Sequence, residues 1–453
     1  MRVCHGVVAT FDDPNLVSCA GLAPVLSLAE RAGLQRLAAE HVRIDKPGGR
    51  FAEVKVPALV AGMVAGADSI DDMDLLRHGG MDRLFGGVRA PSTLGTFLRA
   101  FTFGHVRQLD AVASRLLIRL AGAAPLLPGA TELAYVDADD TVRQTYGYAK
   151  QGAGRGYTGV KGLNALIATI STPTSAPVIA AVRLRKGSTN SVKGAHRLVA
   201  DALVTAKAAG ATGVRVLRAD SAFYSHDVIA ACHRHDSRFS ITARQDRAVR
   251  KAIAAIDDHA WTPIKYTRAV YDHDQQRWIS DAEVAEIGYT AFTSKAKDKQ
   301  VTARLIVRRV PDLNPANQNE LFTAYRYHAV FTDSPSPMVQ AEKAPRAHAV
   351  VEQVIADLKN GPLAHLPSGH FWANSAWLVC AAMAFNLTRA AGTLASVLHA
   401  RATTGTIRAQ LINIPARIAR SARRLTLHLP VGWPWEHGWR QLLASSTGPP
   451  LAA

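Results

Sequence analysis

Apolar residues recur at helical spacing through the first part of the chain. Two such runs are Val25–Leu37 and Ala58–Ala67, and Ser69–His78 has a serine N-cap with acids in its first turn. A glycine-punctuated turn follows, and Pro91 opens a further helix. We predict a helical N-terminal DNA-binding domain over residues 1–127. A helix-turn-helix that lays its second helix against DNA and a plain helical hairpin both fit this pattern.

From residue 130 onward, strand and helix patterns alternate. The predicted strands and helices are, in order, strand Leu133–Thr141, its hairpin partner Arg143–Lys150, strand Ala176–Leu184, helix Val192–Ala209, strand Val214–Asp220, helix Ser225–His235 and strand Arg238–Ala243. Together they predict an α/β fold with a mixed sheet and flanking helices. Residues 128–245 would form the first part of this core.

Strand-like runs then interrupt the rhythm. They are Trp261–Ile264, Val284–Phe292, Val301–Val310 and Phe322–Phe331. We predict an antiparallel β insertion over residues 246–333. The core would resume over residues 334–395, with a helix at Pro345–Lys359 and a buried helix at Phe371–Arg389, and a basic C-terminal segment would follow over residues 396–453.

The overall charge changes the set of expected partners. Of 453 residues, Lys and Arg outnumber Asp and Glu by 53 to 36, a formal net charge of +17, which favours nucleic acid. The longest apolar run, Ala376–Phe385, is about half the roughly 20 residues that a spanning helix needs, so we expect no membrane association. The four cysteines form no Cys-x-x-Cys pair, which is typical of a reducing cytoplasm.

The predicted strand Leu133–Thr141 begins with apolar residues and finishes with three closely spaced aspartates, Asp137, Asp139 and Asp140. On a strand, Asp137 and Asp139 share one face and Asp140 takes the other. Carboxylates this close repel unless a cation lies between them, so the stretch is either half of a metal site or an acidic turn. A second predicted strand ends at Asp220, and open α/β sheets place their sites at such strand ends. This coincidence favours the metal site.

A third acid, Glu352, lies on the predicted helix Pro345–Lys359. At 100° per residue it sits beside an apolar stripe, on the same face as His348 and Lys359. A carboxylate beside buried residues is costly unless it is paired or bound to a metal. Two strand-end aspartates and a helical glutamate can hold two divalent cations, and oxygen ligands suit Mg²⁺.

These motifs resemble a known family. Asp-x-Asp-x-Thr at 137–141, Leu-Arg-Ala-Asp-Ser-x-Phe at 217–223 and Glu-x6-Lys at 352–359 look like bacterial insertion-sequence DDE transposases, most closely the insertion sequence 1380 group. The resemblance runs from about 130 to 395. It implies an RNase H-like core with a catalytic triad of Asp139 (or Asp137), Asp220 and Glu352. It further implies that the triad binds two Mg²⁺ ions, for which Mn²⁺ would substitute, and that Lys359 contacts a DNA phosphate.

The last motif departs from the family pattern. His348 and Pro345 occupy positions where the family has Arg and Tyr. A histidine can contact phosphate but is mostly neutral at pH 7, so the hold on DNA should be weaker there. Arg346 is a nearby candidate for the same contact, although its helical angle points away from Glu352.

The C-terminal segment is strongly basic. No Asp or Glu occurs between Asp357 and Glu436. Within that interval arginines accumulate at Arg401, Arg408, Arg417, Arg420, Arg423 and Arg424. Positive charge followed by the tryptophans at 433, 435 and 439 is typical of a DNA-backbone surface, and a solvated basic tail is the alternative.

The sequence therefore predicts a cytoplasmic, nucleoid-associated DDE transposase. It would bind terminal inverted repeats in double-stranded DNA, cleave element ends and join 3′-hydroxyls to target DNA, as a homodimer in the synaptic complex. Two alternatives stay open: a catalytically silent, transposase-derived DNA-binding protein, and an RNase H-like structure-specific nuclease.

Overall fold

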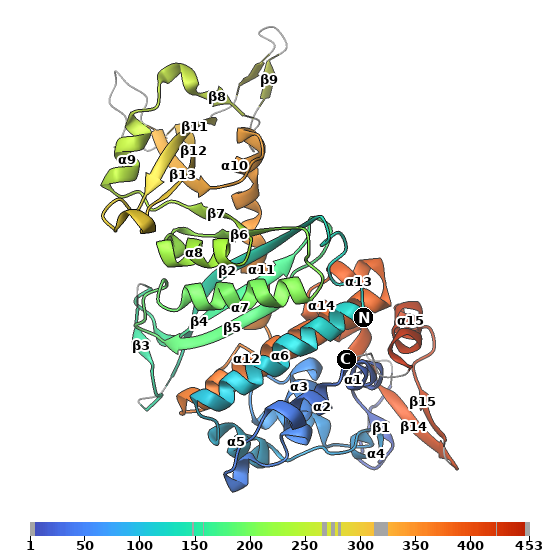
Figure 1. The fold of residues 1–453 in the computed structure, drawn as a ribbon. Helices are drawn as coiled ribbons and strands as arrows, with labels where there is room; N and C mark the ends of the chain where they lie inside the picture. Colours follow the sequence, from blue (N-terminus) through green and yellow to red (C-terminus); the bar gives the residue numbers. More distant parts are fainter. Residues whose placement is uncertain are drawn as a thin grey trace. The chain divides into compact units, whose positions relative to one another are not determined.

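The computed structural model describes residues 5–146, 149–156, 158–264, 270–272, 277–279, 282–311, 325–422 and 424–448. The chain folds into two compact units, which we describe separately (Figure 1). Unit 1 combines Met1–Val112 with Asn360–Ala453, and unit 2 is Ala113–Lys359. The boundaries that the sequence predicts for five segments stay predictions.

Unit 1 is mostly helical, as expected for the N-terminal part of the chain. Its N-terminal helices are α1 (Leu22–Arg31), α2 (Leu34–His41), α3 (Ala52–Ala65), α4 (Met81–Leu84) and α5 (Pro91–Arg99). Its C-terminal elements are helices α12 (Phe371–Ala395), α13 (Val397–Arg401), α14 (Thr404–Ile407) and α15 (Glu436–Ser446), and strands β14 (Ala416–Ser421) and β15 (Arg424–His428). Strand β14 pairs with both β15 and the short β1 (Leu16–Val17). One prediction was wrong in detail: the segment 69–78 forms a 3-10 helix over Asp71–Leu76.

The long helix α12 forms the centre of unit 1, where it packs against α1, α3, α5 and α15. By length and composition it could cross a bilayer, but 89% of its most apolar window is buried inside the protein. A core helix has this burial, and the predicted buried helix is confirmed.

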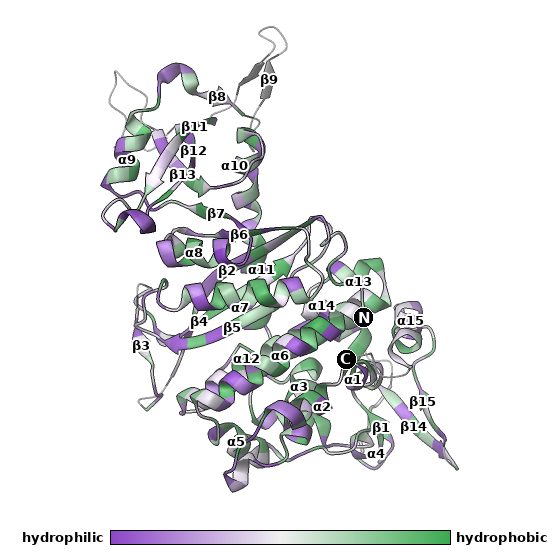
Figure 2. Cartoon of the chain, in the orientation of Figure 1, coloured by the Kyte–Doolittle hydropathy of each residue, from purple (hydrophilic) through white to green (hydrophobic). Residues whose placement is uncertain are grey.

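Helix α6 (Phe103–Ala123) contains the boundary between the units. Its buried residues Val106, Leu109, Val112, Leu116 and Leu120 recur every three or four positions. Figure 2 shows the corresponding mixture of hydrophobic and hydrophilic colouring along this helix. The amphipathic pattern explains why this stretch is helical and which stripe of it is covered.

Unit 2 is built on one large mixed sheet. Its strands are β2 (Leu133–Gln144), β3 (Gly154–Arg155), β4 (Lys161–Ser171), β5 (Val178–Lys186), β6 (Val214–Ala219), β7 (Arg238–Thr242), β8 (Thr262–Pro263), β11 (Glu283–Ala291), β12 (Val301–Pro311) and β13 (Tyr325–Thr332). They are ordered β3-β4-β2-β6-β7-β13-β12-β11-β8, and β5 also pairs with β4. Strands β2, β6 and β7 are parallel, and the other pairs are antiparallel. A separate hairpin joins β9 (Val270–Asp272) and β10 (Arg277–Ile279).

The hairpin predicted after the carboxylates was wrong. Strand β2 does not end there but continues to Gln144, so residues 143 and 144 belong to β2 itself. Gly147 and Tyr148 of the predicted partner lie outside the described residues. The antiparallel partner of β2 is β4, an almost fully buried strand that the sequence pattern did not predict. Its continuous apolar run follows glycine-rich sequence, and such a run lacks the alternation that marks a half-exposed strand.

Helices cover both faces of this sheet, which confirms the predicted mixed α/β class. Figure 1 shows α7 (Ala195–Ala208) and α8 (His226–Arg234) in front of the sheet and α11 (Val350–Lys359) behind it. Helix α7 contacts β2, β4 and β5, and α11 contacts β2 and β4. Helix α9 (Arg247–Ala254) follows β7, and α10 (Met338–Arg346) packs on β11 and β12. The helix predicted to open at Pro345 therefore has this proline at the end of α10, and α11 begins five residues later.

Candidate active site

Asp139 and Asp220 come together where two parallel strands separate. Strands β2 and β6 pair in register up to Ala138 opposite Ala219, and the two aspartates are the next residues along each strand. Beyond this point β6 gives way to a short 3-10 helix, Ser221–Phe223, which Asp220 caps by accepting a hydrogen bond from the Ala222 amide at 3.0 Å. The geometry thus places both predicted acids at one edge of the parallel part of the sheet.

Asp137 has different surroundings. Its carboxylate is completely buried and accepts two hydrogen bonds from Arg218, from Nε at 2.8 Å and from Nη2 at 2.7 Å. His348 Nδ1 lies 3.0 Å from the same carboxylate. A bidentate arginine pair with so little solvent satisfies the buried charge. Asp137 is therefore engaged with two basic side chains, and His348 faces the sheet.

Asp140 lies on the opposite face of β2, as the strand alternation predicts, and is held there by a polar network. Its Oδ2 accepts hydrogen bonds of 2.8 Å from Arg185, Asn164 and Ser191. Arg185 also donates to the carbonyl oxygens of residues 190, 191 and 193, so this ion pair fixes the loop that follows β5. Asp140 thus forms a buried ion pair with Arg185.

The carboxylates line an open hollow of about 570 Å³. Asp139, Asp140 and Asp220 lie along it together with the polar loop 188–191 and Arg244, which follows strand β7. Acids and hydroxyl or amide groups thus share the hollow with an exposed arginine. Such a lining can hold a cation at one place and a phosphate group at another.

In this hollow it is electrostatically unfavourable for Asp139 and Asp220 to be charged at the same time. The pKa of Asp139 is raised to about 6, mainly by burial. The charges of Asp220 and Asp140 act in the same direction, and a hydrogen bond from the Asp140 amide and the nearby His348 act against them. Burial also raises the pKa of Asp220, and Asp140 adds to that effect. A group with pKa near 6 that sits beside a like charge is typical of a functional site.

Glu352 is not brought beside these two aspartates. Its side chain is exposed, and among the described residues it makes no hydrogen bond or ion pair. The residues of α11 that face the core are Val351, Val354, Ile355 and Leu358. Glu352 does lie beside this apolar stripe, as predicted, but its side chain reaches solvent, so its position creates no need for a partner.

The other residues of the last motif are placed as follows. Lys359, at the end of α11, has a pKa below its ordinary value, because burial and the nearby Arg143 lower it more than Asp139 raises it. Arg346 points elsewhere: its Nη2 lies 2.9 Å from Glu342, which also pairs with Arg308.

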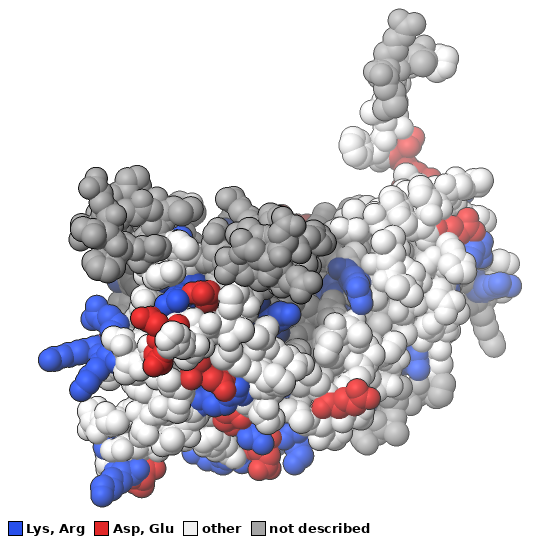
Figure 3. Space-filling view, turned by 90° about the horizontal axis from the view of Figure 1, so that it is seen from above, with Lys and Arg blue, Asp and Glu red and all other residues white. Residues whose placement is uncertain are grey.

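Three of the predicted C-terminal DNA contacts are described. Arg417 and Arg420 lie on β14 and Arg424 on β15, and all three are exposed. Arg417 forms an ion pair of 3.1 Å with Asp13, and Arg423 lies outside the described residues. On the face of the molecule seen in Figure 3, by contrast, basic and acidic side chains are interspersed. Within unit 2, Arg304 and Arg309 likewise pair with Glu286 and Glu283.

The acid pair fits a divalent cation in part. Asp139 and Asp220 offer hard oxygen donors, and their mutual repulsion would be relieved by a bound cation. Within the described part of the chain, however, no three His, Cys, Asp or Glu side chains are grouped to hold a metal ion. The third donor that the resemblance implies is not in place here.

Sequence reasoning missed Arg218, Arg185 and Arg244. Arg218 could have been found, because an arginine inside an apolar strand, two residues before Asp220, must share its face and needs a buried partner. Arg185 and Arg244 gave no such signal, since each directly follows a predicted strand, where a solvated arginine is ordinary. In the structure Arg185 belongs to β5.

The comparison with known families identifies the chain. Residues 4–446 match the family described as Transposase DDE domain group 1, so the protein belongs to this family of DDE transposases. Transposition, and with it the cutting and joining of DNA, is thus the class of activity. No curated protein matches the sequence closely enough to add a relative.

Proposed function

We propose that the protein is the transposase of an insertion sequence of the 1380 type, which binds inverted repeats, cleaves the element ends and joins their 3′-hydroxyls to target DNA. The observation that carries this is the pair Asp139 and Asp220 at the separation of β2 and β6, beside a hollow that also holds Arg244. Two acids on neighbouring parallel strands supply oxygen donors of the kind that two-metal phosphodiester chemistry uses.

The sheet order supports an RNase H-like core. Strands β5, β4 and β2 are antiparallel neighbours, and β6 and β7 continue parallel to β2. In this proposal β8, β11, β12 and β13 are the β insertion, which extends the same sheet through β7. Helix α11, which carries Glu352 and Lys359, then packs against β2 and β4.

The residues have distinct roles in this scheme. Asp139 and Asp220 would hold the divalent cations, with Glu352 as the third acid, since its carboxylate is unpaired among the described residues. Bound Mg²⁺ would activate the attacking oxygen and stabilise the leaving one. Lys359 would position the DNA end, Arg244 would bind a backbone phosphate, and Arg417, Arg420, Arg423 and Arg424 would contact more distant DNA.

End cleavage in vitro tests this function directly. A labelled DNA fragment carrying an element end should be cut by the wild type in Mg²⁺ and left intact by Asp220→Ala. Chelation should stop cutting without releasing the DNA, because the basic contacts need no metal. Equal cleavage by wild type and Asp220→Ala would rule out this site. Equal cutting of unrelated ends would instead support the structure-specific nuclease.

A second candidate function rests on the last motif. His348 is held against Asp137, and Glu352 stands apart from the two aspartates. A catalytically silent DNA-binding protein would bind inverted repeats with strong salt dependence and cut neither in Mg²⁺ nor in Mn²⁺. Restored cleavage in His348→Arg would reject this candidate.

A further inference from the structure

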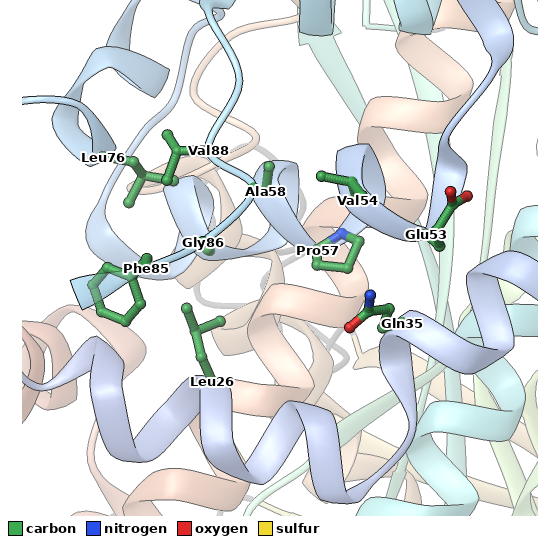
Figure 4. Close-up of a pocket in the computed structure, with 12 residues that line it drawn as sticks. Leu26, Gln35, Glu53, Val54, Pro57, Ala58, Leu76, Phe85, Gly86 and Val88 are labelled. Carbon is green, nitrogen blue, oxygen red and sulfur yellow. The ribbon is translucent and has the colours of Figure 1, made fainter. Parts of the chain in front are cut away.

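Unit 1 has an apolar groove that nothing in the transposase chemistry uses. Two hollows, of about 370 Å³ and about 440 Å³, adjoin between α1, α2, α3 and the segment 84–88. They share the lining residues Leu26, Gln35, Pro57, Phe85 and Gly86. Figure 4 shows apolar side chains around the first hollow, with Gln35 and Glu53 at one end. We call the two hollows together the groove.

The same unit has an uncovered apolar segment. Residues 5–12, which we call the arm, form no helix or strand, and Val7, Val8 and Phe11 are 78%, 92% and 107% exposed. In an extended chain Val7, Ala9 and Phe11 share one face, with Val7 and Phe11 about 13 Å apart. An apolar face of this kind gains free energy when it is covered.

The base of the arm is fixed, so the arm projects from a defined place. Asp13 pairs with Arg417 at 3.1 Å, Arg83 donates to Asn15 at 2.6 Å, and the Gly80 amide donates to the Leu16 carbonyl at 2.8 Å. Residues 80–83 lead directly into the segment 84–88 that walls the groove. The base of the arm therefore contacts the residues that immediately precede the groove's wall, and the groove itself stays open.

We infer that the arm of a second copy of this chain occupies the groove. In its described residues each chain combines the uncovered apolar arm with the open groove, so in two copies each arm can occupy the other's groove through a two-fold exchange. The groove offers two adjoining hollows for the two anchors, Phe11 and Val7. The acidic residues that line the groove are Glu53 and Glu30. The arm carries no acid before Asp12, so its residues 5–11 would not be repelled by these two carboxylates. The result is a dimer that forms without DNA.

Sedimentation velocity of the full chain over a range of concentrations, without DNA or metal, measures this exchange. The wild type should form a concentration-dependent dimer. Replacing both Val7→Ser and Phe11→Ser, or Leu26→Glu alone, should raise the dimer Kd at least about tenfold, since buried anchors dominate small interfaces. Val431→Ser is the matched control, because Val431 is 103% exposed in the same unit and belongs to neither arm nor groove.

Mixing the arm variant with the groove variant distinguishes an exchange of arms from other contacts between two chains. The arm variant keeps its groove and the groove variant keeps its arm, so an equimolar mixture should recover part of the dimer. If Leu26→Glu lowers the thermal midpoint strongly, Gly86→Leu replaces it, because a Cβ at Gly86 meets nothing within 4 Å. A monomeric wild type, or a dimer that neither variant weakens, overturns the inference. A monomer that the arm variant destabilises would show instead that the groove takes its own arm.

The outcome is separate from the proposed end cleavage. Dimerisation is read without DNA, and cleavage is read with Asp139 and Asp220 intact. Either result can therefore fail while the other stands.

Discussion

At the scale of single residues, three neighbouring aspartates on one strand have three different surroundings. Asp137 is buried against Arg218, Asp140 is tied to Arg185, and Asp139 faces Asp220 across the end of the parallel pairing. Two of the three carboxylates thus already have a cationic partner from the protein. Asp139 is left as the acid with the strongest need for an external cation.

Substitutions at Asp137 and Asp139 should therefore fail in different ways. Asp139→Asn should leave the fold intact and reduce Mg²⁺-dependent cleavage by roughly 10²–10³-fold or more, as expected when a preorganised charge is lost. Asp137→Ala leaves Arg218 buried and unpaired, so it should lower the free energy of unfolding by about 3–5 kcal/mol. Denaturant unfolding and cleavage of one DNA substrate, measured on both variants, check this. A fully stable but inactive Asp137→Ala would make Asp137 the first acid.

The raised pKa of Asp139 predicts how stability depends on pH. Its pKa is about 6 in the folded chain against 3.8 in the unfolded one, so the folded state binds a proton more tightly. Stability from this group is fully present below about pH 4 and is lost as the pH rises through about 6. Without metal, the thermal midpoint should fall between about pH 4 and about pH 6, and Mg²⁺ should restore it. Asp139→Asn should remove most of this fall.

At the scale of elements, the hairpin of β14 and β15 is the clearest candidate for contact with DNA. Beyond Arg417, where its pairing with β1 ends, it is a two-stranded ribbon, which the major groove of DNA can admit. It carries exposed arginines at 417, 420 and 424. No acid lies on either strand. Its paired backbone gives these arginines a fixed spacing that a solvated tail would lack.

Removing two of these charges should weaken DNA binding without affecting the fold. The double variant Arg420→Ala, Arg424→Ala should make the slope of log Kobs against log[salt] less steep by about 2, roughly 0.9 for each phosphate that is no longer neutralised. Fluorescence anisotropy at several salt concentrations measures the slope. Arg440→Ala is the control, because Arg440 is exposed but already pairs with Glu436 on α15. An unchanged slope in the double variant would favour the solvated-tail alternative.

At the scale of the whole molecule, the net charge of +17 makes the protein a polyelectrolyte partner for DNA. If six to ten phosphates are neutralised, the affinity for any duplex should fall with a log–log slope of roughly −5 to −9. Binding to random-sequence and element-end duplexes, compared at two salt concentrations, tests this. A slope near zero would mean that the excess charge lies away from the DNA.

The sequence by itself determined the class of fold, the two strands that position Asp139 and Asp220, the buried helix α12 and the basic C-terminal stretch. These follow from local patterns: apolar periodicity defines strands and helices, and unpaired charge is visible in composition. The family resemblance reached the correct class of DDE transposase from three short motifs.

Only the tertiary structure decided which carboxylate is free and which chain segments form one unit. Arg218 pairs with Asp137, which is 81 positions away in the sequence. Helix α12, from the C-terminal part of unit 1, packs against α3 from its N-terminal part. No local pattern encodes such partners, because burial depends on residues distant in sequence. For the same reason the sequence did not predict β4, because a strand buried on both faces lacks the alternation of apolar and polar residues. It also did not predict that Glu352, beside the apolar stripe of its helix, would be exposed to solvent.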